Sequence, residues 1–229
     1  LAKRRLFEAA GSAPKVVNVD DEHGARLAQE FPDATTVALD READLRLDAE
    51  GRLEGRALQV PLPGRFNLLN ALCAVAAARA LGVDDDTIFA ALPNARVAPG
   101  RFQPVDEGQD FTVVVDYAHT PEALENVLRT AREVATGRVI VVFGAGGDRD
   151  KAKRPLMGAA ATANADVVVL TSDNPRSEEP ELIIADVARG AGRAQAVIDR
   201  REAIEYAIGM AQAGDVVVVA GKGHEQGQE

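Results

Sequence analysis

The stretch RVIVVFGAGGDRDKAKRPLMGAAATANADVVVLTSDNPR (residues 138–176) determines the fold class. It contains two apolar runs with the length of a buried strand, at 138–143 and 167–171, and a polar segment follows each run. Between them, the alanine-rich residues 155–163 favour a helix. Two buried strands separated by a helix predict neighbouring parallel strands in one sheet.

The same alternation continues on both sides of this stretch. The helix after residue 120 has the clearest start, because Thr120 can cap it, Pro121 suits its first position and Glu122 favours its positive end. Strands that alternate with helices predict an α/β domain whose mostly parallel sheet is covered by helices on both faces. The further strands are expected at 111–116, 194–198 and 216–220, and the further helices at 121–131, 181–189 and 201–211.

The first hundred residues form a different unit, with shorter strands and longer helices. A segment rich in Pro, Asn and Gly at 93–100 separates it from the rest, so we expect domains at 1–99 and 100–229. The run Asp84, Asp85 and Asp86 is expected to cap a helix rather than to bind a metal. The expected elements are strands at 16–20 and 35–39, a two-stranded β segment formed by 44–48 and 53–63 around a turn at 49–51, and helices at 22–30, 66–81 and 84–92.

Composition excludes several classes of protein. The chain has 229 residues and a net charge of −10, which argues against a nucleic-acid partner and an anionic membrane surface. It has no apolar run long enough to cross a membrane and no signal peptide, so we expect a cytoplasmic location without membrane insertion. Its one cysteine, Cys73, excludes a disulfide framework and is expected to pack in the core.

Polar segments follow four of the predicted strands, at 116–119, 144–151, 172–176 and 221–225. Ligands of open α/β sheets bind beyond the carboxyl ends of the strands. Because parallel strands end at the same edge of a sheet, we expect these four segments to meet there. The sequence therefore predicts one site built from all four.

The glycine-rich segment 144–147 has two interpretations. It could cradle a phosphate, or its glycines could serve a tight left-handed turn. It has neither the GxxxxGK[ST] nor the GxGxxG spacing, and GxxxxGK[ST] occurs nowhere in the chain. Arg149 lies between Asp148 and Asp150, which suggests that the two carboxylates orient its guanidinium group.

The segment DNPR, residues 173–176, can hold a zwitterion. Asp173 could bind an ammonium group, and Arg176 could bind a carboxylate through two parallel hydrogen bonds. The structural alternative is an Asx-turn with a proline before the next helix. His119 and His224 each follow a predicted strand, where a histidine can act in catalysis or serve as a cap or core residue.

Motifs along most of the chain resemble the ATP-dependent Mur ligases of peptidoglycan synthesis, in the branch that adds diaminopimelate. VDYAHTP, GGDRDKxKRP and DNPR are together highly specific. The resemblance implies that residues 1–99 are the C-terminal part of a central ATP-binding domain and residues 100–229 a Rossmann-like amino-acid-binding domain. The motifs are KRRLF (3–7), NVDDEHG (18–24), GRFNLLNALCAVAAARALG (64–82), PGRF (99–102), VDYAHTPEALENVL (115–128), VFGAGGDRDKAKRPLMG (142–158), DNPRSEEP (173–180) and VAGKGHE (219–225).

The resemblance also implies roles for individual residues. Lys3 matches a lysine that carries a carbamate in this family, and carbamate oxygens are ligands that Mg²⁺ prefers, so Lys3 is a candidate catalytic and metal-binding residue. The implied ATP-binding residues are Asn67, Arg101, Asp116 and His119, of which the last two are also candidate catalytic residues. The implied diaminopimelate-binding residues are Arg149, Asp173, Asn174, Arg176, Gly221 and Glu225.

The implied reaction forms an amide through an acyl phosphate, with ATP and Mg²⁺ as cofactors. The partners would be diaminopimelate and UDP-N-acetylmuramoyl-L-alanyl-D-glutamate, whose D-glutamyl carboxylate accepts the phosphoryl group before the amine attacks. The P-loop and the UDP-binding domain of a full ligase do not occur in the chain. We therefore expect a fragment, inactive by itself and monomeric.

Two alternatives stay open. A ligase that adds L-lysine would use the same chemistry, but lysine lacks the second carboxylate that Arg176 would bind, so DNPR favours diaminopimelate. A non-catalytic amino-acid-binding α/β module would explain why the chain has no P-loop motif. ATP turnover by the chain would distinguish the second alternative from an enzyme.

Overall fold

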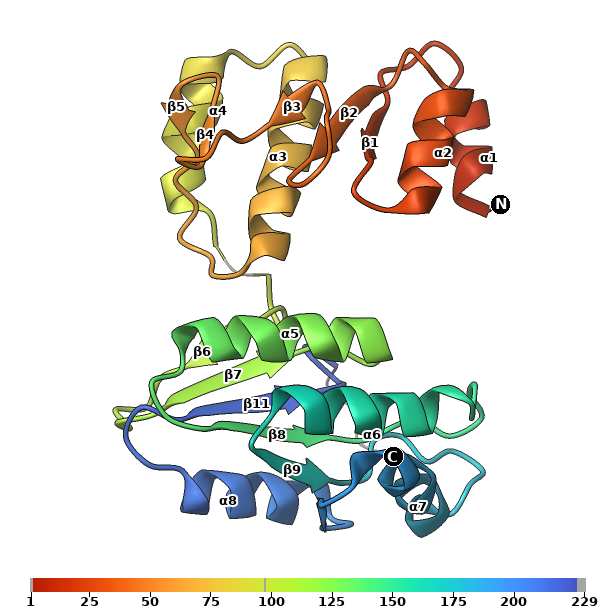
Figure 1. The fold of residues 1–229 in the computed structure, drawn as a ribbon, viewed down its shortest axis with the longest axis vertical. Helices are drawn as coiled ribbons and strands as arrows, with labels where there is room; N and C mark the ends of the chain where they lie inside the picture. The colour runs from red at the N-terminus through yellow and green to blue at the C-terminus, as the bar shows by residue number, and fades with distance from the viewer. Residues whose placement is uncertain (1, 97, 226–229) are drawn as a thin grey trace. The chain divides into compact units, whose positions relative to one another are not determined.

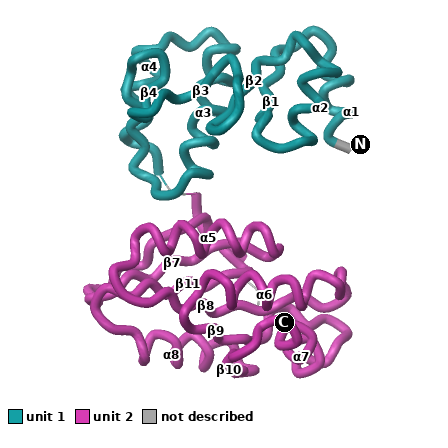
Figure 2. Tube along the Cα trace, in the orientation of Figure 1, with its two compact units in different colours: residues 1–96 teal, residues 97–229 magenta. Residues whose placement is uncertain are grey.

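The computed structural model describes residues 2–96 and 98–225, and the chain divides into two compact units (Figures 1 and 2). The first spans residues 1–96 and the second residues 97–229. Each contains a parallel sheet joined by helices, so the α/β class and the mostly parallel sheet are confirmed. None of the helices in the described ranges has both the length and the apolar character that crossing a bilayer requires.

The first unit has a three-stranded parallel sheet with helices on both faces. On one face of the sheet, α1 and α2 cover a core that contains Val17 and Ala38. On the other face, α3 and α4 contribute to a core that contains Val37 and Leu72. The elements are α1 (Ala2–Ala9), β1 (Val16–Asn18), α2 (Glu22–Glu30), β2 (Thr35–Ala38), β3 (Leu45–Arg46), β4 (Arg52–Leu53), β5 (Arg56–Ala57), α3 (Arg65–Ala80), α4 (Asp85–Ala91) and a 3₁₀ turn at Leu92–Asn94.

One expected element of this unit is wrong. Residues 44–48 were expected to pair with 53–63, but β3 pairs in parallel with β2, and the hairpin is formed by β4 and β5 alone. Burial explains the difference, because Leu45 packs into the core beside Val37. Asp44 adds to this pairing, since its carboxylate accepts hydrogen bonds from the backbone N–H and the hydroxyl of Thr36, both at 2.8 Å.

The second unit is built on a six-stranded sheet in the order β10-β9-β8-β11-β7-β6. All neighbouring strands are parallel except the edge strand β6, which runs antiparallel to β7. The last strand along the described chain, β11, therefore lies between β7 and β8. The strands are β6 (Gln103–Val105), β7 (Thr112–Asp116), β8 (Val139–Phe143), β9 (Val167–Leu170), β10 (Gln195–Ala196) and β11 (Val216–Ala220).

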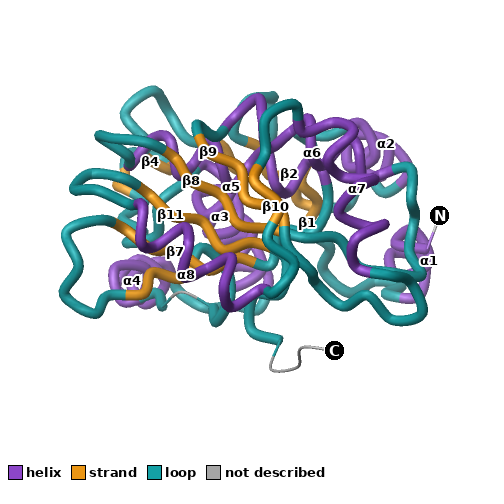
Figure 3. The backbone as a smooth tube through the Cα atoms, turned by 90° about the horizontal axis from the view of Figure 1, so that it is seen from below, coloured by secondary structure: helices purple, strands orange, loops and turns teal. Residues whose placement is uncertain are grey.

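Helices cover both faces of this sheet, as expected. Three helices, α5 (Pro121–Val134), α6 (Lys153–Asn164) and α7 (Pro180–Ala191), pack one after another on one face (Figure 1). The fourth, α8 (Arg200–Met210), covers the other face, which is turned toward the viewer in Figure 3. Every residue of β8 and β11 is buried between these layers.

Glycines let α6 and α7 approach closely. A Cβ atom on Gly158 of α6 would lie 2.2 Å from the carbonyl oxygen of Val187. A Cβ atom on Gly190 of α7 would lie 1.8 Å from the carbonyl oxygen of Pro155. Neither distance is compatible with a side chain, so the two helices are in backbone contact.

Candidate functional site

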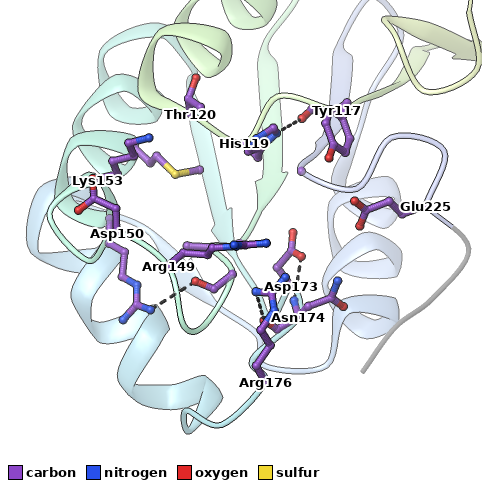
Figure 4. Close-up of a pocket in the computed structure, with 16 residues that line it drawn as sticks. Tyr117, His119, Thr120, Arg149, Asp150, Lys153, Asp173, Asn174, Arg176 and Glu225 are labelled. Carbon is purple, nitrogen blue, oxygen red and sulfur yellow. Dashed lines mark hydrogen bonds between the residues drawn. The ribbon is translucent and has the colours of Figure 1, made fainter. Parts of the chain in front are cut away.

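The four polar segments predicted to meet at the carboxyl edge of the sheet line one pocket of about 370 Å³. Each of the loops after β7, β8, β9 and β11 contributes to its wall, and Figure 4 shows their side chains around a common space. The expected convergence is confirmed. The lining residues are Tyr117, His119, Thr120, Gly144, Ala145, Gly146, Arg149, Asp150, Lys153, Arg154, Met157, Asp173, Asn174, Arg176, Gly221 and Glu225.

Close backbone contact explains the glycine-rich segment after β8. The left-handed residue of this loop is Asp148, with a φ of +52°, while Gly144, Gly146 and Gly147 do not have positive φ angles. The predicted left-handed turn is therefore present, but none of these glycines supplies it. A Cβ atom on Gly147 would instead lie 1.8 Å from the carbonyl oxygen of Pro175, and one on Gly144 would lie 2.3 Å from that of Thr171. The glycines therefore allow the loop after β8 to lie directly against the loop after β9.

Hydrogen bonds hold these two loops together. Arg176 Nη1 donates to the carbonyl oxygen of Gly147 at 2.6 Å, and the N–H of Gly147 donates to the carbonyl oxygen of Asn174 at 2.9 Å. Asp173 does not form an Asx-turn in DNPR, because Pro175 has no N–H to donate to its carboxylate. Asp173 Oδ1 accepts the N–H of Asn174 at 2.8 Å instead.

The structure places Arg149 on the pocket wall but does not orient it by its neighbours in sequence. Asp148 accepts the hydroxyl of Ser177 at 2.7 Å, and Asp150 accepts the N–H of Ala152 at 3.0 Å. The interpretation that both carboxylates orient the guanidinium group is therefore wrong. Arg149 is exposed, forms no hydrogen bond or ion pair with the described residues, and extends over the pocket in Figure 4.

Lys222 orients the amide of Asn174. Its Nζ lies 2.6 Å from Asn174 Oδ1 and 4.0 Å from Asp173 Oδ1, and the lysine is buried. Because an ammonium group only donates hydrogen bonds, it fixes Oδ1 of the amide on its own side. Gly221, with φ of +115°, is needed here, since a Cβ atom would lie 2.7 Å from Asp173 Oδ2. Sequence reasoning included Lys222 in a polar segment but gave it no role.

Three aromatic rings and one guanidinium group gather at the end of β7. The rings of Tyr117 and His119 lie 4.7 Å apart, and the Arg101 guanidinium carbon lies 4.9 Å from the centre of the Tyr117 ring. The His224 ring lies 6.0 Å from that of Tyr117. His119 does not cap α5, because the hydroxyl of Thr120 accepts the N–H of Ala123 and takes that position.

Asp116 is buried behind this cluster and is not among the pocket-lining residues. One carboxylate oxygen accepts the N–H of Phe102 at 2.7 Å, and the other accepts that of Ala118 at 2.8 Å. Burial raises the pKa of this carboxyl, while the two N–H groups act in the opposite direction. Asp116 therefore joins the segment of Arg101 to the segment of His119.

The remaining sequence-predicted residues lie on the first unit. Lys3 is exposed on α1. Asn67, at the start of α3, is half-buried and donates from Nδ2 to the carbonyl oxygen of Pro63 at 2.8 Å. Asp84 accepts the N–H of Thr87, which confirms its capping role. Within residues 2–96 and 98–225, no group of three or more His, Cys, Asp or Glu side chains is arranged to hold a metal.

Two family models match the chain. Residues 1–78 match the Mur ligase middle domain, and residues 100–223 match the model described as Mur ligase, glutamate ligase domain. The second match covers more than half of the chain. Both units therefore have counterparts in one family.

The chain is similar to enzymes named UDP-N-acetylmuramoyl-L-alanyl-D-glutamate–2,6-diaminopimelate ligase. The one from Geobacillus kaustophilus is 54% identical over 173 residues, which cover 74% of this chain and 35% of the relative. The one from Aquifex aeolicus is 44% identical over 243 residues, which cover 100% and 50%. A solved structure of that name has a TM-score of 0.58 at 41% identity, covering 100% of this chain and 51% of the other.

These coverages mean that the chain spans about a third to a half of the length of the curated relatives it matches. The matches extend over both units and include the loops that line the pocket. On these grounds the chain belongs to the Mur ligase family.

Proposed function

We propose that these residues belong to a ligase that joins diaminopimelate to UDP-N-acetylmuramoyl-L-alanyl-D-glutamate in peptidoglycan synthesis. Membership of the Mur ligase family and the names of the similar enzymes support the reaction class. The observation that carries the choice of amino acid is a charge pattern. Arg149 and Arg176 line the pocket with guanidinium groups, and Asp173 and Glu225 line it with carboxylates. The other charged lining residues are Asp150, Lys153 and Arg154, of which Arg154 is already paired with Glu178 and Asp186.

This pattern complements diaminopimelate, which has two carboxylates and two ammonium groups. Arg176 uses Nη1 to hold Gly147, while its Nε and Nη2 have no partner among the described residues and can together bind a carboxylate. Arg149 is available for the other carboxylate. Asp173 and Glu225 are proposed to accept hydrogen bonds from the ammonium groups.

The surrounding helices favour the carboxylates. α5 and α6 begin directly after loops that line the pocket, and α7 begins after the DNPR loop. The amino-terminal end of a helix carries a partial positive charge and attracts anions. The helix ends at this edge of the sheet should therefore attract a substrate with two carboxylates more strongly than lysine, which has one.

The reaction proposed is amide formation at an activated carboxylate, with ATP supplying the phosphoryl group that activates it. The pocket residues bind the amino acid, exclude alternative orientations and direct one amino group toward the acyl donor. Because the two reactants are held together, much of the rate enhancement comes from proximity. Asn67, Arg101, Asp116 and His119 are proposed for the nucleotide, with Asp116 acting through the backbone segments of Arg101 and His119.

For Mg²⁺, the described residues fit only in part. A carbamate on Lys3 would offer oxygen ligands, but α1 brings no further acidic cluster beside it within the described residues. We therefore assign no step of the reaction to a metal bound by this chain alone.

The test is a ligation assay with the complete protein that carries these residues. UDP-N-acetylmuramoyl-L-alanyl-D-glutamate and ATP are supplied with either meso-diaminopimelate or L-lysine, and the product is identified by mass. A higher kcat/KM for diaminopimelate is expected. Preference for lysine would identify the lysine-adding alternative, and binding of diaminopimelate without ligation would leave only an amino-acid-binding module.

A further inference from the structure

A buried arginine in the wall of the pocket has no role in the function proposed above. Arg154, in the first turn of α6, is 2% exposed, although it also lines the pocket. Arginine is rarely buried unless carboxylates surround it, and here two are present. Nη1 and Nη2 donate to the two carboxylate oxygens of Glu178 at 3.0 and 2.8 Å, and Nη1 also donates to Asp186 at 2.9 Å.

The two carboxylates connect Arg154 to different parts of the fold. Asp186 lies within α7, so this contact joins α6 to α7. Glu178 lies in the segment between DNPR and α7, and its carboxylate also accepts the N–H of Asp148 at 2.8 Å. Arg154 Nη2 reaches the carbonyl oxygen of Gly146 at 3.3 Å. The Glu178 contact therefore reaches the two loops that carry the substrate-binding guanidinium groups.

The same two loops are cross-linked at further points. Within the loop after β9, the N–H of Glu178 donates to the carbonyl oxygen of Pro175 at 3.0 Å. Between the two loops, Asp148 accepts the hydroxyl of Ser177 at 2.7 Å. Lys151 Nζ lies 2.9 Å from Glu178 Oε2. With Arg154 at the centre, residues 146–151 and 175–178, which include Arg149 and Arg176, form one hydrogen-bonded unit.

We propose that Arg154, paired with Glu178, is a positioning residue for diaminopimelate, because it holds the loops of Arg149 and Arg176 in the geometry that binds two carboxylates. This inference rests on the function proposed above. It assigns no direct contact between Arg154 and the substrate. Arg154 acts by fixing the distance between two groups that must bind the substrate at the same time.

The donors around the carboxylate of Glu178 make its contact with Arg154 sensitive to substitution of Glu178. Its Oε1 accepts from Arg154 and from Asp148, and its Oε2 accepts from Arg154 and from Lys151. In Glu178→Gln, an amide NH₂ replaces one oxygen and faces donors, which repel it. The loops would then lose the fixed spacing without any loss of side-chain volume.

The experiment compares the two contacts of Arg154 in the complete ligase. Arg154→Met would remove the arginine that both buried contacts share and threaten folding, so the variants are Glu178→Gln and the matched control Asp186→Asn. Each removes one charge beside the same arginine, but only Glu178 reaches the pocket loops. KM and kcat for diaminopimelate and ATP are measured with the melting temperature.

Glu178→Gln is expected to lower kcat/KM for diaminopimelate by about 10- to 100-fold, mainly through KM, because a displacement of about 1 Å can cost a factor on the order of 100. The KM for ATP is expected to stay unchanged. Asp186→Asn is expected to lower the melting temperature while leaving the KM for diaminopimelate unchanged.

Equal values of KM for diaminopimelate in the two variants would overturn the positioning role, as would a rise in KM for ATP equal to that for diaminopimelate. The wild-type enzyme separates this failure from a failure of the proposed function. A wild-type enzyme that does not accept diaminopimelate overturns the proposed function, and the positioning role with it. A wild-type enzyme that accepts it, beside an unaffected Glu178→Gln variant, overturns the positioning role alone.

Discussion

Arg176 Nη1 donates a 2.6 Å hydrogen bond to the carbonyl oxygen of Gly147. A single guanidinium group thus ties two loops together and still has Nε and Nη2 for a ligand. Arg176 also has a φ of +53°, which is uncommon for a residue with a side chain. Stability and substrate choice are therefore both expected to depend on this residue, and the two effects have to be measured separately.

Removing the guanidinium group should change the choice of amino acid. In the complete ligase, Arg176→Ala is expected to lower kcat/KM for diaminopimelate by about 30- to 5000-fold. Arg176 is exposed here, but a bound substrate would desolvate the charge pair, and truncating one partner of such a pair costs about 2–5 kcal/mol. The loss for lysine is expected to be much smaller. Arg176→Lys should restore little, because an ammonium group lacks the planar fork.

The backbone strain at Arg176 supplies the control. Arg176→Gly removes the same guanidinium group but accepts a positive φ, so it should be more stable than Arg176→Ala by about 1 kcal/mol. Both variants should show the same ratio of kcat/KM for diaminopimelate and lysine. If the ratio is that of the wild type in both, Arg176 is a structural residue and does not bind the substrate.

Gly147→Ala should damage the pocket through the backbone. The new methyl group would lie 1.8 Å from the carbonyl oxygen of Pro175, so the loops after β8 and β9 must separate. A lower melting temperature and a higher KM for diaminopimelate are expected. Gly209→Ala is the control, because no atom lies within 4 Å of its added methyl group and it should stabilise α8 by about 0.5–1 kcal/mol. A Gly147→Ala enzyme with an unchanged KM would contradict the close-contact argument.

The ion pair of Arg138 and Asp215 should appear in the acid unfolding of the second unit. Arg138 Nη2 donates to Asp215 Oδ2 at 2.7 Å, and this contact lowers the pKa of Asp215 to about 2. Because the folded-state pKa lies below the unfolded one, the pair stabilises the fold above about pH 4 and loses this effect as the pH falls toward 2.

Chemical denaturation of wild type and Asp215→Asn at several pH values measures this effect. The free energies of unfolding should differ by about 1–2 kcal/mol near neutral pH, allowing for screening at the half-exposed guanidinium, and should converge toward pH 2. Glu107→Gln changes an exposed carboxyl with no ion pair among the described residues and serves as the control. A difference between wild type and Asp215→Asn that is independent of pH would contradict the prediction.

Lys3 is proposed to act through a carbamate, which only a primary amine on this side chain can form. Lys3→Ala in the complete ligase should lower kcat by at least the factor of about 10–100 that is typical of losing an outer partner of a metal site. A small carboxylate added to the assay should restore part of the activity. Lys3→Arg keeps the positive charge but should be as inactive as Lys3→Ala, and an active Lys3→Arg enzyme would exclude the carbamate.

Much of the second unit could be predicted because its central strands are buried on both faces. Such strands appear as continuous apolar runs, so their positions and the polar segments after them are visible in the sequence. The convergence of Asp173 with Glu225 followed from the parallel arrangement alone. The order of the strands in the sheet could not be predicted in this way, because it depends on which helices pack together.

The residues that sequence reasoning missed owe their roles to contacts between distant segments. Arg154 looks like any cation near the start of a helix, and its burial arises because Gly158 and Gly190 bring α6 and α7 into backbone contact. The first helix, at Ala2–Ala9, and the edge strand at Gln103–Val105 were also not predicted. Both are short, and short elements depend more on their neighbours than on their own pattern.

The central position of β11 has a consequence for how the protein is made. The ribosome synthesises β7 and β8 well before β11. In the folded sheet these two strands do not pair with each other, because β11 lies between them and pairs with both. Until residue 220 has emerged, the nascent chain exposes two unpaired strand edges, which are sites of aggregation. The pocket loop at 221–225 comes later still. Translation that stops or slows shortly before β11 should therefore recruit chaperones to the nascent chain. Translation that stops or slows within the first unit should recruit far fewer.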